Sequence, residues 1–168
     1  MGATGASGPL GDEIEWTPIV ADEATAVLRA AGVSVIREKA EFSGRYNVRI
    51  AVFIHFDGAD DVCVSGASIG YDDSTDKPAA DEWKALYSRY WPFKWMPDNF
   101  TRNLSHYYGF GFANTSDAEL VLELGEISCL EQAQWLKPRL KWLGLLIAHF
   151  ISKRIGRGEV PDPGPFTQ

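Results

Sequence analysis

The stretch RYNVRIAVFIHF, residues 45–56, decides the fold class of this chain. Apolar side chains at every second position place one continuous apolar face on an extended strand. The alternating apolar residues are Tyr46, Val48, Ile50, Val52 and Ile54. The turn-forming residues 57–60 follow, and residues 61–71, DVCVSGASIGY, read as the next strand. Because the connection is short, we expect these two strands to pair antiparallel.

Towards the N-terminus, the sequence predicts a helix and a further strand. Asp22 is the N-cap candidate, and Gly32 stands where a helix often ends. Residues 33–40 then read as a strand. Before the helix, Gly, Ala and Ser dominate the first residues, which is typical of a flexible tail.

Towards the C-terminus, a helix is predicted over residues 79–90. Residues 91–112, WPFKWMPDNFTRNLSHYYGFGF, are rich in aromatic side chains and contain two prolines, so they cannot form one helix. We expect a strand over residues 106–113, paired as a hairpin with the alternating segment AELVLELGEI, residues 118–127. A helical segment, interrupted by Pro138, covers residues 128–155.

These elements predict an α+β domain with an antiparallel sheet of four to five strands. Helices pack mainly on one face, and a long C-terminal helix closes the domain. The predicted divisions are a flexible N-terminal tail over residues 1–13, a single domain over residues 14–158 and a flexible Pro-rich tail over residues 159–168.

Charge and composition favour some environments and partners over others. The net charge is −7, which disfavours nucleic acid and favours a protein partner with a basic surface. The apolar run LKWLGLLIAHFI, residues 140–151, is too short to span a membrane. The N-terminus lacks the pattern of a secretory leader, so we predict a cytoplasmic protein with Cys63 and Cys129 as buried free thiols.

Tests for catalytic and metal-binding motifs give few candidates. The three histidines lie in different predicted elements without metal-ligand spacing. His55 and Asp57, two positions apart on a strand, share a face and could act together in a small hydrolase with the clustered aspartates. Asp72, Ser74 and Asp76 start like a calcium loop, but the required Gly and Glu are absent. We predict no cofactor and no metal.

The acidic loops and the aromatic stretch remain as a possible interaction surface, because aromatic side chains anchor interfaces and acidic loops attract basic partners. The predicted partner-binding residues are Asp57, Asp60, Asp61, Asp72, Asp73, Asp76, Trp91, Phe93 and Trp95. We therefore expect a non-catalytic acidic inhibitor, such as a toxin-immunity protein, that occludes a basic partner. The alternatives are a structural subunit of a viral particle or other large assembly, in which case homo-oligomers form, and the small hydrolase using His55. Core packing is the competing explanation for the aromatic residues.

Overall fold

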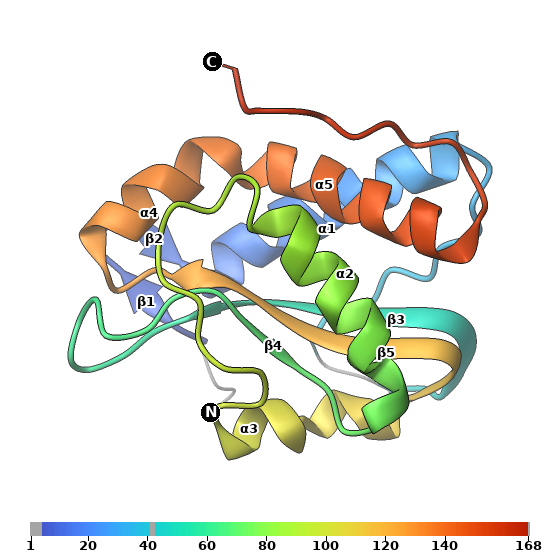
Figure 1. Cartoon of the computed structure of the whole chain (residues 1–168), viewed down its shortest axis with the longest axis horizontal. Helices are drawn as coiled ribbons and strands as arrows, with labels where there is room; N and C mark the ends of the chain where they lie inside the picture. Colours follow the sequence, from blue (N-terminus) through green and yellow to red (C-terminus); the bar gives the residue numbers. More distant parts are fainter. Residues whose placement is uncertain (1–4, 41–42, 168) are drawn as a thin grey trace.

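The structure is a computed structural model that describes residues 5–40 and 43–167. A sheet of three strands lies between helices (Figure 1). The elements in chain order are β1 Ser7–Gly8, β2 Gly11–Asp12, α1 Glu13–Ala30, β3 Tyr46–Asp57, β4 Ser68–Gly70, η1 Ser74–Asp76, α2 Lys77–Tyr87, α3 Arg102–Ser105, η2 Tyr108–Gly111, β5 Ala113–Glu126, α4 Leu130–Leu136, η3 Lys137–Arg139 and α5 Leu140–Ile155. The α+β class is confirmed.

The sheet has the order β3-β5-β4 and is mixed. β3 pairs parallel with β5, and β4 pairs antiparallel with β5. The prediction of a purely antiparallel sheet of four to five strands is therefore wrong. Local alternation had identified the long strands, but the chain returns to β3 only after residues 58–112, and this crossover sets the parallel direction.

Two predicted strands are shorter than expected or absent. Of residues 61–71, only Ser68–Gly70 forms a strand. Residues 106–113 instead contain η2, and Gly109 is packed so tightly that a Cβ there would lie 2.4 Å from Tyr107 and 2.8 Å from Phe53. Phe53, Tyr107 and Phe110 thus pack together at a compact turn, and residues 106–113 do not form the predicted hairpin strand.

Helix α1 begins ten residues before the position expected from Asp22 as N-cap. Asp12 is its N-cap, and Glu15 completes a capping box with it. Pro18 lies inside the helix near its start, where it removes one backbone hydrogen bond. The helix ends before Gly32, whose φ is +80°, as predicted. The strand predicted over residues 33–40 is not formed.

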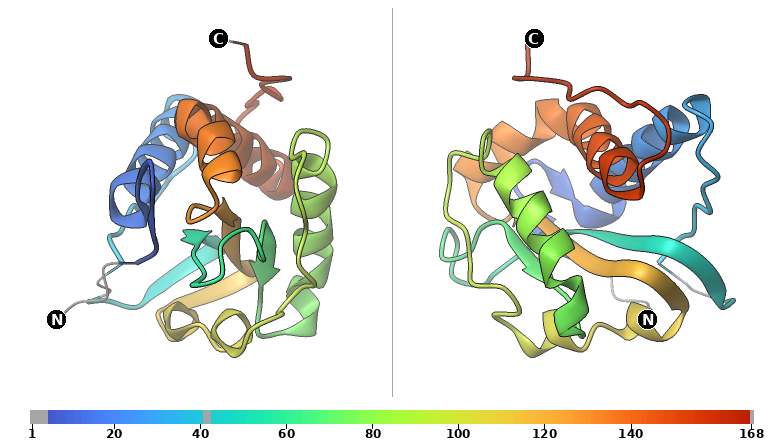
Figure 2. Two further views of the ribbon diagram at one scale, coloured as in Figure 1. Left: turned by 90° about the vertical axis from the view of Figure 1, so that its left-hand side faces the viewer. Right: turned by 45° about the vertical axis from the view of Figure 1, so that its right-hand side comes forward.

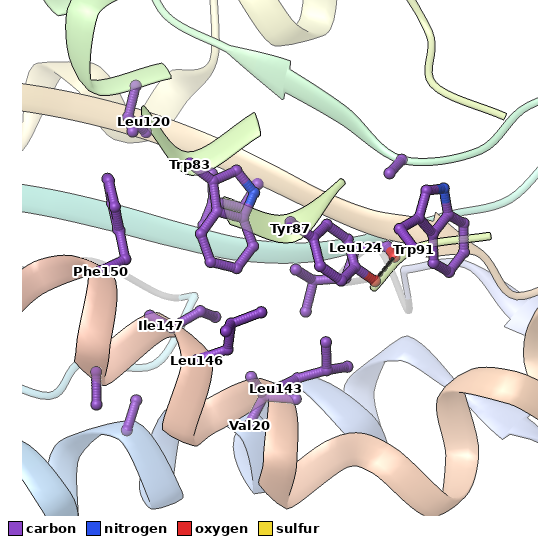
Figure 3. Packing of buried hydrophobic residues seen from close by; sticks show 14 of the residues in the cluster. Val20, Trp83, Tyr87, Trp91, Leu120, Leu124, Leu143, Leu146, Ile147 and Phe150 are labelled. Atoms are coloured by element: carbon purple, nitrogen blue, oxygen red, sulfur yellow. Dashed lines mark hydrogen bonds between the residues drawn. The ribbon is translucent and has the colours of Figure 1, made fainter. Parts of the chain in front are cut away.

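Helices lie on both sides of the sheet (Figure 2). α1, α4 and α5 form the layer on one face, α3 and η2 lie under the other face, and α2 stands beside the sheet. The core lies between the sheet and the α1–α5 layer, where Leu120 and Leu124 of β5 meet Leu143 and Ile147 of α5 (Figure 3). The opposite face carries His55 and Glu123 together with Phe53, which packs against Tyr107 and Phe110.

The C-terminal part follows the predicted pattern. α4 ends before Pro138, and the long helix α5 begins after it. Within residues 5–40 and 43–167, no helix is long and apolar enough to cross a membrane.

The two cysteines form a disulfide, so the prediction of two free thiols is wrong. Cys63 and Cys129 are 66 positions apart and joined by a bond between the loop after β3 and the start of α4. Two isolated cysteines in separate elements carry no local sign of pairing, because only the fold brings them together.

The segments next to the ends of the chain make defined contacts. β1 and β2 form a two-stranded sheet just before α1, whereas residues 1–4 of the predicted N-terminal tail lie outside the described residues. In the C-terminal segment Val160 is buried, and Gly164 accepts a hydrogen bond from Trp142 Nε1 at 2.9 Å.

Candidate active site

Three elements place a histidine and two carboxylates beside one another. His55 lies near the end of β3, and Glu123 is its partner in the parallel register of β5. Because these strands are neighbours and run parallel, side chains in register share a face of the sheet. Glu13, the first residue of α1, reaches the same place, since its carboxylate lies 2.7 Å from Nδ1 of His55.

His55 is fixed through both of its ring nitrogens. Nδ1 contacts Oε1 of Glu13, and Nε2 lies 2.9 Å from the hydroxyl of Tyr107. The ring of Tyr107 also meets the imidazole edge to face, with 5.1 Å between ring centroids. A carboxylate on one nitrogen and a hydroxyl on the other hold the ring in one orientation, as in hydrolytic sites where a carboxylate orients a catalytic histidine.

Glu13 is held in its ionised form by several hydrogen bonds. Its Oε2 accepts from the backbone of Ala6 at 2.8 Å, and its Oε1 accepts from the backbone of Phe56 at 3.3 Å. Burial by itself would raise the pKa of Glu13, but His55 and these two N–H groups outweigh burial, so the net pKa is lowered. Glu13 is therefore a stable anionic partner for the histidine.

The protonated form of His55 is favoured in return. Burial alone would lower its pKa, yet the hydrogen bond to Glu13 and the negative charges of Glu123 and Glu13 outweigh it and raise the pKa of His55. Tyr107 stays a neutral phenol, because burial and its neighbour Tyr108 raise its pKa.

Glu123 has the opposite character to Glu13. Its Oε2 is buried and has no hydrogen-bond partner among the described residues. Burial raises the pKa of Glu123 to about 8, helped by the charges of Asp57 and Glu13 and opposed by His55. At neutral pH this carboxyl group holds a proton that it can donate.

The described side chains do not form a complete metal site. A catalytic zinc ion takes three protein ligands and keeps one position for water. In residues 5–40 and 43–167, no three His, Cys, Asp or Glu side chains are placed to hold a metal ion. Glu13 and His55 bond directly to each other, and the second ring nitrogen of His55 already faces Tyr107.

Asp57, the predicted partner of His55, has a different role. Its carboxylate accepts hydrogen bonds from the Ser65 hydroxyl and from the backbone of Gly58, not from His55. Burial raises its pKa in spite of these bonds. Asp57 therefore acts on the site through its charge, which helps to raise the pKa of Glu123.

The predicted acidic loops do not converge. Asp60 and Asp61 are exposed, whereas Asp72, Asp73 and Asp76 line a separate pocket. A hydrolase that gathers carboxylates from both loops is therefore excluded.

The aromatic residues of the predicted interface lie in or against the core. Trp91 is only 5% exposed, and Phe93 and Trp95 are partly buried and pack against the core. Whether any of the nine predicted residues contacts a partner stays a prediction.

Sequence reasoning found His55 but missed Glu13, Tyr107 and Glu123. Alternation with leucine by itself places Glu123 on the solvent-facing side of a half-exposed strand. The useful signal was a glutamate inside the strongly apolar segment of residues 118–127, because such a residue must be buried if the strand is central.

With this geometry established, comparison with known proteins gives a clear likeness in fold. No model of a known protein family matches the sequence, and no curated protein is significantly similar to it. Among solved structures, the chain is similar to the catalytic domain of CwlV, an N-acetylmuramoyl-L-alanine amidase from Bacillus (Paenibacillus) polymyxa var. colistinus. The TM-score is 0.69 at 14% identity, over 94% of this chain and 93% of that one.

Two further solved structures share the fold. The N-acetylmuramoyl-L-alanine amidase AmiC2 of Nostoc punctiforme matches with a TM-score of 0.69 and 17% identity, over 92% of this chain and 91% of that one. Cwp6 from Clostridium difficile matches with a TM-score of 0.70 and 17% identity, over 92% of this chain and 28% of that one.

These likenesses overturn the prediction of a non-catalytic inhibitor or immunity protein. The chain shares its fold with two N-acetylmuramoyl-L-alanine amidases, and within that fold it brings two glutamates and a histidine together. Acidity and small size had suggested an inhibitor, but both are properties of the surface and say nothing of side chains that converge inside the fold.

Proposed function

We propose that this chain is a hydrolase that cleaves an amide bond at Glu13, His55 and Glu123. One observation carries the proposal: Glu123 has a buried oxygen without a hydrogen-bond partner among the described residues, and it lies in register with a histidine that a second glutamate orients. The pKa of Glu13 is lowered and that of Glu123 is raised, and neighbouring carboxyl groups with opposite pKa shifts are typical of acid–base catalysis.

The chemistry follows from the protonation states. After it has lost its Nε2 proton, His55 keeps the Nδ1 proton towards Glu13 and presents Nε2 as a proton acceptor; because its pKa is raised, this form gains population as the pH rises. A water molecule that replaces the Tyr107 hydroxyl at Nε2 gives its proton to His55 while its oxygen bonds to the amide carbon. Glu123 then donates its proton to the amide nitrogen, the C–N bond breaks, and a carboxylic acid and an amine leave.

The proposed substrate class is the amide bond between an N-acetylmuramoyl group and L-alanine, because two proteins of similar fold are N-acetylmuramoyl-L-alanine amidases. The disulfide Cys63–Cys129 supports a working place outside the reducing cytosol, because such bonds persist in oxidising compartments. We therefore propose an oxidising compartment in place of the cytoplasm predicted from the sequence.

The test uses a synthetic N-acetylmuramoyl-L-alanyl peptide and detects the released alanyl amino group by mass spectrometry. We expect release by the wild-type chain and a loss of about 10²- to 10⁴-fold in Glu123→Gln, which keeps the shape but cannot donate the acid proton. Asp61→Asn, an exposed aspartate in a loop, serves as the control and should keep full activity.

The assay is run once with a chelator and once with added Zn²⁺. Release of the alanyl peptide only in the presence of Zn²⁺ would indicate that a side chain outside the described residues completes a metal site. No release in either condition, or equal release by wild type and Glu123→Gln, would contradict the proposal.

A further inference from the structure

A polar pocket lies at the other end of β5, away from Glu123. It has a volume of about 490 Å³ and lies between the segment around η1 and the first half of β5. Its lining includes Asp72, Asp76 and Glu119 and the edge of residues 113–117. This volume is in the range of pockets that bind small molecules, but the lining is polar and acidic.

The pocket occurs where the sheet loses a strand. β4 pairs with β5 only from Val121 to Glu123 among the described residues, so the earlier part of β5 has β3 on one side and no strand on the other. A side chain replaces the missing strand at one point, where Asp76 Oδ1 accepts a hydrogen bond from the backbone of Glu119 at 3.2 Å. The edge of residues 113–117 remains as one wall.

Glu119 is the unusual residue of this pocket. It is 6% exposed, and its Oε1 is buried without a hydrogen-bond partner in residues 5–40 and 43–167. Burial, followed by the charges of Asp72 and Asp76, raises the pKa of Glu119 to about 8. A buried oxygen without a partner is costly, so a ligand that supplies a donor and a positive charge would remove the cost.

Basic side chains nearby have other partners. Arg154 is bound to Asp117 at 2.7 Å and to Glu82 at 2.8 Å. Lys77, directly after η1, is bound to Asp81 on the exposed surface of α2. Neither of these two basic side chains forms an ion pair with Glu119, whose negative neighbours dominate its surroundings.

We propose that this pocket binds a ligand through a primary ammonium group, with Glu119 as its main partner and Asp72 and Asp76 as the surrounding charge. A metal ion fits less well, since no three carboxylates or other ligand side chains of the described segments are placed to hold one. An ammonium group needs acceptors but no fixed coordination sphere. The site is separate from Glu123, and the proposal does not depend on the amidase activity.

The ammonium group could belong to a lysine side chain or to a free diamine. Isothermal titration at about pH 7 with Nα-acetyl-lysine amide and with cadaverine distinguishes these sources. Binding of either probe supports the site, and preference for the lysine probe indicates that backbone groups of the ligand also contact the β5 edge. The Nε-acetylated lysine probe has no charge, and we expect it to bind at least about tenfold more weakly.

Single substitutions test whether the ammonium group binds at this pocket. Glu119→Gln keeps the side-chain shape, and we expect it to weaken the lysine probe by about tenfold or more. Asp72→Asn, at an exposed wall of the pocket, should weaken it several-fold without any change in the core. Asp61→Asn removes the same charge elsewhere, so it should change binding by less than about twofold.

Binding should also release protons, because an ammonium group favours the ionised form of Glu119. Repeating the isothermal titration in buffers of different ionisation enthalpy measures this proton release, which should disappear in Glu119→Gln. The proposal is overturned if neither probe binds at millimolar concentration, if the acetylated probe binds equally well, or if Asp61→Asn weakens binding as much as Asp72→Asn does. Displacement of the probe by stoichiometric Ca²⁺ would overturn it in favour of a metal site.

Discussion

At the scale of single residues, Glu126 shows how this fold uses a buried acid for structure. Glu126 is 0% exposed, and its carboxylate accepts hydrogen bonds from the backbone of Cys63 at 2.6 Å and of Ser65 at 2.7 Å, and from the Ser128 hydroxyl at 2.7 Å. These hydrogen bonds hold the loop that carries Cys63 and Ser65 against the end of β5. Since Ser65 also bonds Asp57, this loop helps to shape the surroundings of the candidate active site.

Replacing Glu126 by alanine should lower the free energy of unfolding by about 3 kcal/mol, because buried backbone N–H groups lose their acceptors. Urea denaturation measures the loss. Glu159→Ala, an exposed glutamate near the C-terminus, should stay within about 0.5 kcal/mol of wild type. Equal effects of the two substitutions would show that the hydrogen bonds of Glu126 contribute little.

At the scale of elements, the close packing of α1 on α5 depends on Gly144. A Cβ at this position would lie 2.7 Å from the backbone oxygen of Val20 and 2.7 Å from Cβ of Glu23, both in α1. The two helices cover one face of the sheet together, so their separation sets how well the leucines of β5 are buried (Figures 2 and 3).

Gly144→Ala should therefore destabilise the protein by about 1 to 3 kcal/mol, although alanine is the better helix former by about 1 kcal/mol. Thermal unfolding followed by circular dichroism tests this. In the matched control Gly111→Ala, the new methyl group meets no atom within 4 Å, and stability should barely change. A gain in stability in Gly144→Ala would mean that the helices can move apart without cost.

At the scale of the whole molecule, three groups with raised pKa values make stability depend on pH in the same direction. Glu119 and Glu123 have pKa values raised from an ordinary 4.5 to about 8, and the pKa of His55 is raised above 6.5. Between these ordinary values and the raised ones, the folded chain keeps protons that the unfolded chain releases. The free energy of unfolding must then fall as the pH rises.

We expect urea unfolding to give a higher stability at about pH 5.5 than at about pH 8.5, with a slope of at most about 1.4 kcal/mol per pH unit for each group. Glu119→Gln and Glu123→Gln should each make the slope smaller, whereas Glu159→Gln should not. Below about pH 4.5 the lowered pKa of Glu13 acts in the other direction, so stability should fall again in acid. Stability that rises steadily from pH 5.5 to 8.5 would contradict these protonation states.

The sequence alone determined the features that depend on neighbouring residues. Alternation in residues 45–56 predicted β3, alternation in residues 118–127 predicted the main part of β5, Gly32 predicted the end of α1, and Pro138 predicted the break before α5. These signals are local, because strand alternation, helix termination and the missing N–H of proline act over a few residues. His55 was found for the same reason, as a polar residue at the end of a strong strand.

Only the tertiary structure decided which segments meet. The parallel pairing of β3 with β5 puts His55 beside Glu123, and the start of α1 brings Glu13 to the same histidine from 42 positions away. The disulfide between Cys63 and Cys129 and the pocket around Glu119 likewise join segments far apart in the chain. Strand direction and loop closure depend on how the whole core packs, so residue patterns that span a few positions could not specify them.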